Sequence, residues 1–204
     1  TTHVVRKGIT LTTLQHSTMT IEIAPAAQSP QRNAETAGGV ADPAIPAVLY
    51  RDASPLWLGR YFNNVAPAVV SGRERASAYA LPYALPPEHF AAHLTCPLAI
   101  DAALQTCLAR HGDHVEVLIP DRIDRLTLLS GLSNDMELHD RFGPLTLHAT
   151  VSDGQPGASL IQVTPAGGGE VLFEMAGFVG QPLGFIDTAT GRHTDSLSAA
   201  EPAE

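Results

Sequence analysis

The chain has 204 residues, of which 44% are apolar, enough for one globular domain or two small ones. Its formal charge of -9, from 21 acidic and 12 basic residues, argues against a surface that binds nucleic acid or anionic membrane. No apolar run approaches the ~20 residues of a membrane-spanning helix. We therefore expect a cytoplasmic protein without nucleic-acid or membrane partners, and its Arg, Ala and Pro bias is typical of a GC-rich bacterial source.

The chain divides into four segments by composition. Residues 1–24 alternate between apolar and polar residues, which predicts two strands around a turn at 15–17. Residues 25–47 hold mostly small and polar residues, chiefly Ala, Pro, Gly and Gln, without periodicity, which predicts a flexible linker. We expect the globular domain at 48–186 and a disordered tail at 187–204.

The globular segment begins with short elements and one long helix. A hairpin is predicted over 69–82 with its turn at 71–72, and a helical turn over 88–92. Pro97 suits the first position of the main helix, with Thr95 or Cys96 as its cap. The helix is expected to run to Arg110 or His111 and to stop at Gly112.

Four strands are predicted after the helix, at 115–119 with a continuation to 129, 145–151, 158–164 and 171–179. Apolar residues spread around the helix, which is therefore expected to be buried on most sides. The pattern predicts an α+β fold in which a curved antiparallel sheet wraps a long central helix.

Asp101 and Gln105 are the polar pair of this apolar helix, and their spacing places them on one face. An unpaired buried carboxylate is costly, so Asp101 needs either a partner or a function. The structural alternative is that Asp101 accepts hydrogen bonds from the first turn of the helix.

The cysteines and histidines offer weaker candidates. Cys96 and Cys107 lie eleven residues apart on or beside one helix, too far for a disulfide, so both are expected to be reduced. The pairs His89/His93 and His111/His114 do not complete a zinc signature, and no metal site is expected.

The helix resembles the hotdog helix of polyketide synthase dehydratase domains, and also that of the related product-template domains. The match lies in Pro97-x-x-x-Asp101-x-x-x-Gln105. The order of the flanking segments agrees over roughly 48–182. The resemblance implies a hotdog fold, either the second half of a double hotdog or one that pairs with another, and the strands of 1–24 are candidates for the end of a preceding hotdog.

The resemblance also implies a function and a set of site residues. Asp101 would be the acid in dehydration of β-hydroxyacyl thioesters carried on the phosphopantetheine of an acyl carrier protein, without a further cofactor. Gln105 would assist Asp101. We expect the substrate to be bound by residues around this pair: Tyr61, His93, Cys96 and Pro97.

Three departures from the family pattern leave alternatives open. Cys96 stands where the family has His before the helix proline, and Leu58-Gly59-Arg60-Tyr61-Phe62 replaces its Tyr-Gly-x-x-Phe segment. The family's catalytic motif, His-x-x-x-Gly-x-x-x-x-Pro, is absent, so the base is expected outside this chain. The alternatives are an inactive scaffolding domain, and a cyclase or isomerase that uses the same pocket.

Overall fold

The computed structural model describes residues 2–6, 9–14, 31–32, 40–41, 61–62, 64–66, 68–81, 84–128, 134–187 and 189–196. The helices are α2 (Pro87–Phe90), α3 (Pro97–Gln105) and α4 (Asp135–Phe142). The strands are β1 (Thr2–Arg6), β2 (Ile9–Leu14), β3 (Gln31–Arg32), β4 (Val40–Ala41), β5 (Val69–Ser71), β6 (Glu74–Tyr79), β7 (Arg110–His111), β8 (His114–Leu128), β9 (Leu145–Val151), β10 (Gly157–Pro165), β11 (Gly169–Glu170), β12 (Phe173–Asp187) and β13 (His193–Thr194).

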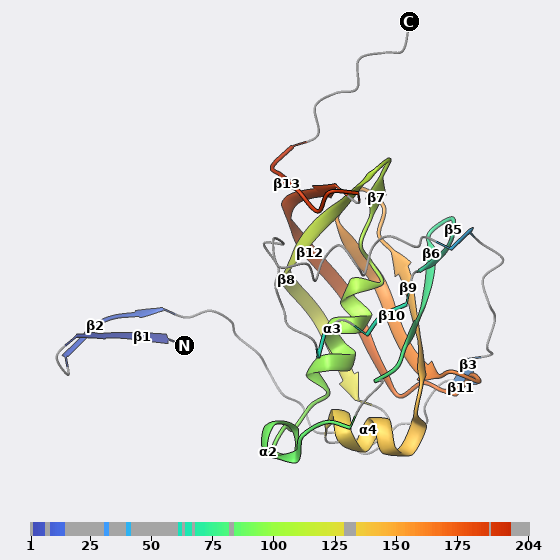
Figure 1. The fold of residues 1–204 in the computed structure, drawn as a ribbon, viewed down its shortest axis with the longest axis horizontal. Coiled ribbons are helices and arrows are strands. Elements are labelled where there is room, and N and C mark those ends of the chain that lie inside the picture. Colours follow the sequence, from blue (N-terminus) through green and yellow to red (C-terminus); the bar gives the residue numbers. More distant parts are fainter. Residues whose placement is uncertain are drawn as a thin grey trace, which may run out of the picture.

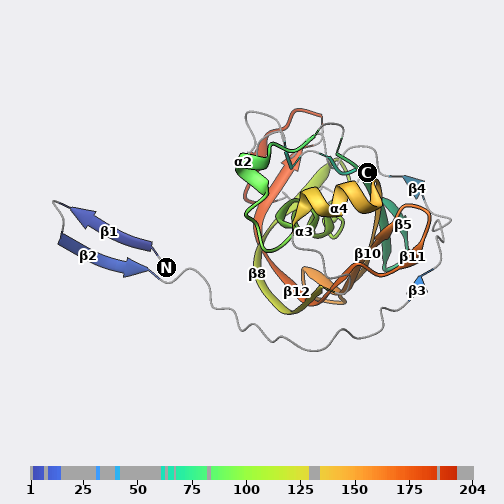
Figure 2. The ribbon, with the colours of Figure 1, turned by 90° about the horizontal axis from the view of Figure 1, so that it is seen from below.

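One antiparallel sheet forms the body of the molecule. Its strands follow the order β4-β5-β6-β9-β10-β12-β8-β7, and β13 pairs with β12. The sheet curves around α3, which lies on its concave side (Figures 1 and 2). The predicted architecture, a central helix wrapped by a curved antiparallel sheet, is therefore confirmed.

The face of α3 that meets the sheet is built from small and aliphatic residues. Leu98, Ala99, Ala102 and Ala103 are buried, with exposed fractions between 0% and 1%. Alanine side chains let the helix backbone approach the sheet closely, while the apolar surface of β9 and β10 supplies the opposite side of the core. This packing fixes which faces of α3 remain for polar residues.

α3 is shorter than predicted, because it ends at Gln105 rather than at Arg110 or His111. The hydroxyl of Thr106 donates to the carbonyl of Ala102 at 3.2 Å, and Arg110–His111 instead forms strand β7. Gly112 has a φ of 58° and lies in the turn between β7 and β8, so it is not the helix stop that was expected.

The structure adds a helix that was not predicted, α4, between β8 and β9. Asn134 caps it by accepting a hydrogen bond from the backbone N–H of Glu137 at 3.0 Å. Its sequence is largely polar, and among its residues Asp135 and Leu138 are buried.

The predicted strands after α3 are present. Two of them, β10 and β12, are longer than expected. β9 has the predicted bounds, and β8 includes the continuation past Ile119. The hairpin turn at Gly72, with a φ of 59°, and the helical turn α2 are also as predicted.

The terminal segments differ from the expected boundaries. β1 pairs with β2, so two strands lie within 2–14, whereas residues 15–24, with the predicted turn at 15–17, are outside the described part. Within the expected linker, β3 pairs with β11 and β4 pairs with β5. Beyond residue 186, β13 pairs with the end of β12, while residues 197–204 are outside the described part. Among the described residues, no helix is long and apolar enough to cross a membrane.

Candidate active site

Asp101 and Gln105 meet on the partly exposed face of α3, as their spacing predicted. The Gln105 side-chain amide donates to Asp101 Oδ2 at 2.6 Å and to the backbone carbonyl of Phe62 at 3.3 Å. The second bond brings the segment 61–62 against the same face of the helix. Together these contacts place a carboxyl group and a carboxamide at one site.

The environment of Asp101 favours its protonated form. Burial raises its pKa to about 6 from an ordinary value of 3.8, and the hydrogen bond from Gln105 acts in the opposite direction. A carboxylic acid with a pKa near the operating pH can deliver a proton and recover it.

Gln105 carries an unused acceptor at this site. Its Oε1 atom is buried and has no hydrogen-bond partner among the described residues. A buried amide oxygen without a partner is costly, so a ligand hydroxyl that donates to it would be favourable.

Three aromatic rings form a row of edge-to-face contacts. Tyr61 and Phe90 meet edge to face with centroids 5.3 Å apart, and Phe90 and His93 do so at 5.5 Å. Tyr61 precedes Phe62, whose carbonyl contacts Gln105. The row therefore links two of the predicted substrate-binding residues, Tyr61 and His93, to the segment that touches the polar pair.

Cys96 and Pro97 lie at the start of α3, before the polar pair. Cys96 occupies the cap position without a side-chain cap hydrogen bond, and its carbonyl accepts from Ile100 at 2.9 Å. Burial, with the charges of Asp135 and Glu137, raises the pKa of the Cys96 thiol to about 12. Cys96 is therefore a neutral thiol, unsuited to nucleophilic catalysis.

Asp135 is the functional candidate that the sequence did not indicate. It is 1% exposed, and its two carboxylate oxygens accept from the backbone N–H groups of Leu98 and Ala99, each at 3.0 Å. These are the donors that the structural alternative assigned to Asp101, so that alternative is wrong. The Asn134-x-x-Glu137 spacing could have indicated the start of α4, but no sequence signal connects Asp135 to α3.

The remaining histidine pairs form separate contacts. His111 lies 3.6 Å from Glu116, and His114 lies 3.9 Å from Asp187. Within the described residues, no three His, Cys, Asp or Glu side chains gather in a way that could hold a metal ion. No histidine there hydrogen-bonds to Asp101 either, so the described part of the chain presents an acid without an adjacent base.

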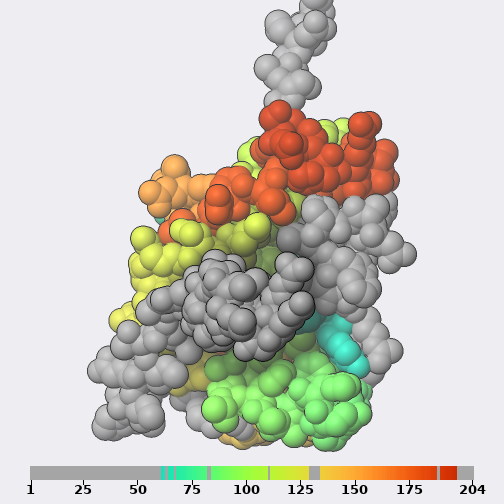
Figure 3. Space-filling view, turned by 90° about the vertical axis from the view of Figure 1, so that its left-hand side faces the viewer, coloured from blue at the N-terminus to red at the C-terminus, as the bar shows by residue number. Residues whose placement is uncertain are grey.

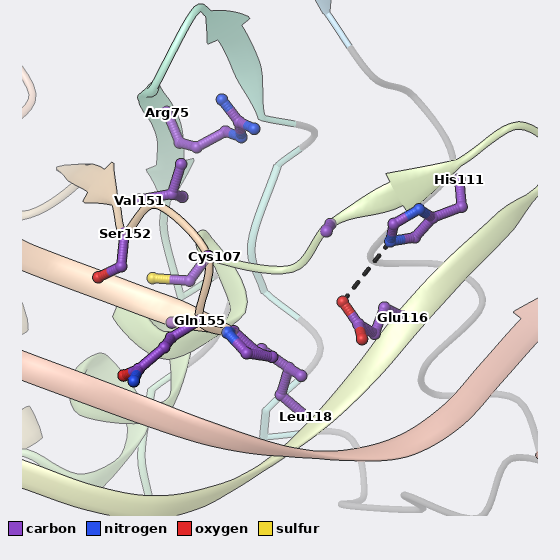
Figure 4. A pocket seen from close by; sticks show the side chains of 12 residues that line it. Arg75, Cys107, His111, Glu116, Leu118, Val151, Ser152 and Gln155 are labelled. Atoms are coloured by element: carbon purple, nitrogen blue, oxygen red, sulfur yellow. Dashed lines mark ion pairs between the residues drawn. The ribbon is translucent and has the colours of Figure 1, made fainter.

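A cavity of about 260 Å³ lies elsewhere, beyond the carboxyl end of α3 (Figure 4). Its lining includes Arg75, Cys107, Ser152 and the His111–Glu116 pair, but neither Asp101 nor Gln105. Burial raises the pKa of Cys107 to about 12, so its thiol is neutral. The face of Asp101 is separate from this cavity, and it combines a raised carboxyl pKa with an acceptor, Gln105 Oε1, that has no partner among the described residues.

Comparisons with known proteins give structural relatives only. No protein-family model matches the chain, and no curated protein matches it significantly. A bifunctional dehydratase-cyclase domain of ambruticin biosynthesis is 25% identical with a TM-score of 0.51, and the alignment covers 78% of this chain and 54% of that one.

Two further solved structures share the fold. A trans-AT polyketide synthase dehydratase domain from Brevibacillus brevis is 17% identical, with a TM-score of 0.53 and coverage of 78% of this chain and 55% of that one. An inactive mutant of the CurJ dehydratase, in complex with a compound, is 16% identical, with a TM-score of 0.54 and the same coverage of each chain, 78% and 55%.

This chain therefore spans about half the length of the solved dehydratase domains that it matches. The resemblance expected from the Asp101 helix is confirmed at the level of the whole fold. The chain is a hotdog domain like those of polyketide synthase dehydratases.

Proposed function

We propose that this chain is the acid-bearing half of a dehydratase that acts on β-hydroxyacyl thioesters carried by an acyl carrier protein. The observation that carries the proposal is the partly buried Asp101 carboxyl group held by Gln105 at 2.6 Å. The structural relatives are dehydratase domains, which agrees with this reaction.

The reaction needs a base at one carbon of a carbon–carbon bond and an acid at the other. A base removes the proton α to the thioester carbonyl, and the electron pair of that C–H bond forms the new double bond. Asp101 protonates the β-hydroxyl group as the C–O bond breaks, so that water leaves and Asp101 becomes a carboxylate. The base is a histidine supplied from outside these 204 residues, and proton exchange with the base or solvent restores Asp101.

Gln105 would serve both the acid and the substrate. Its amide N–H groups hold Asp101 and the carbonyl of Phe62, while its Oε1 atom remains as an acceptor. A β-hydroxyl group that donates to Oε1 would present its own oxygen to the Asp101 proton. Tyr61, His93, Cys96 and Pro97 would then line the path of the thioester.

The proposed base would lie on a second hotdog, and β8 offers an edge to receive it. β8 pairs with β12 along its length, but β7 pairs with its other edge only at His114 and Val115. In the described part of the chain, no strand pairs with that edge further along. Part of β8 lies at the surface in Figure 3. On this strand Ile119 is 41% exposed. An unpaired edge of this length is a template for another strand.

The second hotdog would be an upstream half of the same polypeptide, a partner subunit or a second copy. Light scattering on the isolated chain should show association or a tendency to aggregate. A stable, folded monomer in the absence of any partner would contradict the pairing.

A second candidate reaction is cyclisation of the chain that dehydration produces. It is favoured by the 25% identical relative, which is a dehydratase-cyclase domain. The same acid and acceptor could orient a second hydroxyl group for addition to the new double bond. Isomerisation would use the pocket in the same way, and an inactive scaffold would use none of it.

Mass spectrometry of carrier-bound substrates separates these functions. The complete assembly, incubated with a β-hydroxyacyl carrier protein, should yield a product lighter by one water. A product of unchanged mass but altered chromatographic retention would favour isomerisation. A further product isomeric with the dehydrated chain would indicate cyclisation, and binding of the carrier without any turnover would favour the scaffold.

A further inference from the structure

The first turn of α3 has two backbone donors that the helix itself cannot satisfy. Pro97 has no N–H group, and the N–H of Ile100 reaches the carbonyl of Cys96 at 2.9 Å. The N–H groups of Leu98 and Ala99 remain, in a region where both residues are buried from solvent. Cys96, at the cap position, makes no side-chain bond to either of them.

Asp135 supplies both missing acceptors from another helix. Its Oδ2 atom accepts from Leu98 and its Oδ1 atom from Ala99, each at 3.0 Å, across 37 and 36 residues of sequence. A carboxylate at the amino end of a helix is also favoured by the helix dipole. The cap is therefore complete, and it depends on one side chain.

The carboxylate of Asp135 is itself firmly held. Asp135 lies at the first position of α4. The cap residue of this helix is Asn134, and its residue Leu138 is buried in the core. Burial raises the pKa of Asp135 to about 6, while the two backbone hydrogen bonds and the nearby His93 oppose that rise. The ionised form serves both backbone donors best, because protonation turns one oxygen into a donor and weakens it as an acceptor.

The capped turn lies directly before the acid. Ala99 precedes Asp101 by two residues, which corresponds to about 3 Å along the helix axis. A shift of the first turn would therefore displace the Asp101 carboxyl group from its place opposite the substrate. Misplacement of a reacting group by about 1 Å can cost on the order of 10²-fold in rate.

We infer that Asp135 is a positioning residue for Asp101: its carboxylate, anchored on α4, fixes the first turn of α3 and thereby the place of the acid. This inference rests on the proposed dehydratase function for its kinetic consequence, but not for its structural one. Asp135 does not touch the reacting atoms in this account, because both of its oxygens are engaged by backbone donors.

The test replaces Asp135 by Asn and uses Asp140→Asn as the matched control. Asp140 is an exposed carboxylate of the same helix. In Asp135→Asn, one carboxylate oxygen becomes an NH₂ group that faces a backbone donor. We expect the kcat of the complete assembly to fall about 10- to 100-fold with KM changed by less than about twofold, whereas Asp140→Asn should leave both unchanged.

Two readouts do not depend on turnover. Amide hydrogen exchange of Leu98 and Ala99 should accelerate at least about tenfold in Asp135→Asn, as expected when a buried amide loses its acceptor. The pKa of Asp101, followed by carboxyl ¹³C NMR, should fall towards its ordinary value because the loosened turn admits water. If the unaltered assembly turns over no substrate, the proposed function fails, while these two readouts still decide the role of Asp135.

Asp135→Glu keeps the charge and moves it by one methylene group, and it serves if Asp135→Asn does not fold. It should lower kcat more than it raises KM, because the longer side chain cannot place both oxygens at 3.0 Å from the same donors. A folded Asp135 variant with wild-type kcat, amide exchange and Asp101 titration would overturn the inference. Equal losses in the Asp135 and Asp140 variants would also overturn it.

Discussion

The carboxylate of Asp101 accepts a hydrogen bond of 2.6 Å from the side-chain amide of Gln105, one turn further along α3. Burial favours the protonated acid, whereas this bond favours the carboxylate. The two effects leave the pKa of Asp101 at about 6, where both forms are accessible near neutral pH. A group that must release a proton and recover it in each cycle requires this balance.

The first prediction concerns the pH dependence of dehydration. Asp101 must be protonated to donate to the leaving hydroxyl group, and its pKa is raised to about 6. The kcat/KM of the complete assembly should therefore decline with rising pH above about 6, approaching tenfold per pH unit on the alkaline side. Steady-state rates over a pH series would check this, and a level rate up to pH of about 9 would contradict it.

The second prediction separates the effects of burial and of the Gln105 hydrogen bond on the pKa of Asp101. Gln105→Leu removes the hydrogen bond that lowers the pKa of Asp101 and leaves burial in place. The alkaline limb should then move to higher pH, and kcat should fall because the substrate hydroxyl loses an acceptor. Gln162→Leu is the matched control, since Gln162 donates to Glu174 from strand β10. A limb that moves to lower pH in Gln105→Leu would be inconsistent with the site described above.

The third prediction concerns stability. The pKa of Asp101 is raised in the folded chain from 3.8 to about 6, so its stabilising contribution is complete below pH 3.8 and is lost as the pH rises through about 6. Asp101→Asn should remove this loss and stabilise the chain at pH 7 by on the order of 1–3 kcal/mol. Urea unfolding should show little of this gain at pH of about 4.

Asp140→Asn provides the reference for that comparison, because Asp140 is exposed on α4. It should leave the free energy of unfolding unchanged within about 0.5 kcal/mol at both pH values. If Asp101→Asn instead destabilised the chain at pH 7, the Asp101 carboxylate would stabilise the fold. The expectation that its burial costs stability would then be wrong.

The parts of the fold that follow local pattern were predictable from the sequence. β9 is a short, mostly apolar run whose first five positions are buried or half-buried, and its predicted bounds agree with the structure. Pro97 marked the start of α3 correctly. The predicted end of α3 was wrong. Leu104 and Leu108 continue a helical pattern, but the pairing of β7 with β8 overrides it. α4 was missed because most of its residues are polar.

The site was predictable only where its contacts are local. The pairing of Asp101 with Gln105 follows from a spacing of four residues on a helix. The contact of Gln105 with the Phe62 carbonyl crosses 43 residues, and that of Asp135 with Leu98 crosses 37. Contacts of this range depend on the complete sheet, so neither could be inferred from periodicity or capping patterns.

The central claim is that Asp101 is the acid of a dehydratase whose base lies outside this chain. Its most direct test is the single-turnover rate of Asp101→Asn in the complete assembly, followed by mass spectrometry of the carrier-bound product, with Asp140→Asn as the control. We expect Asp101→Asn to stay folded and to lose at least about 10²-fold in the rate of water loss, while the control retains its rate. A folded Asp101→Asn assembly that dehydrates its substrate at the wild-type rate would contradict the claim.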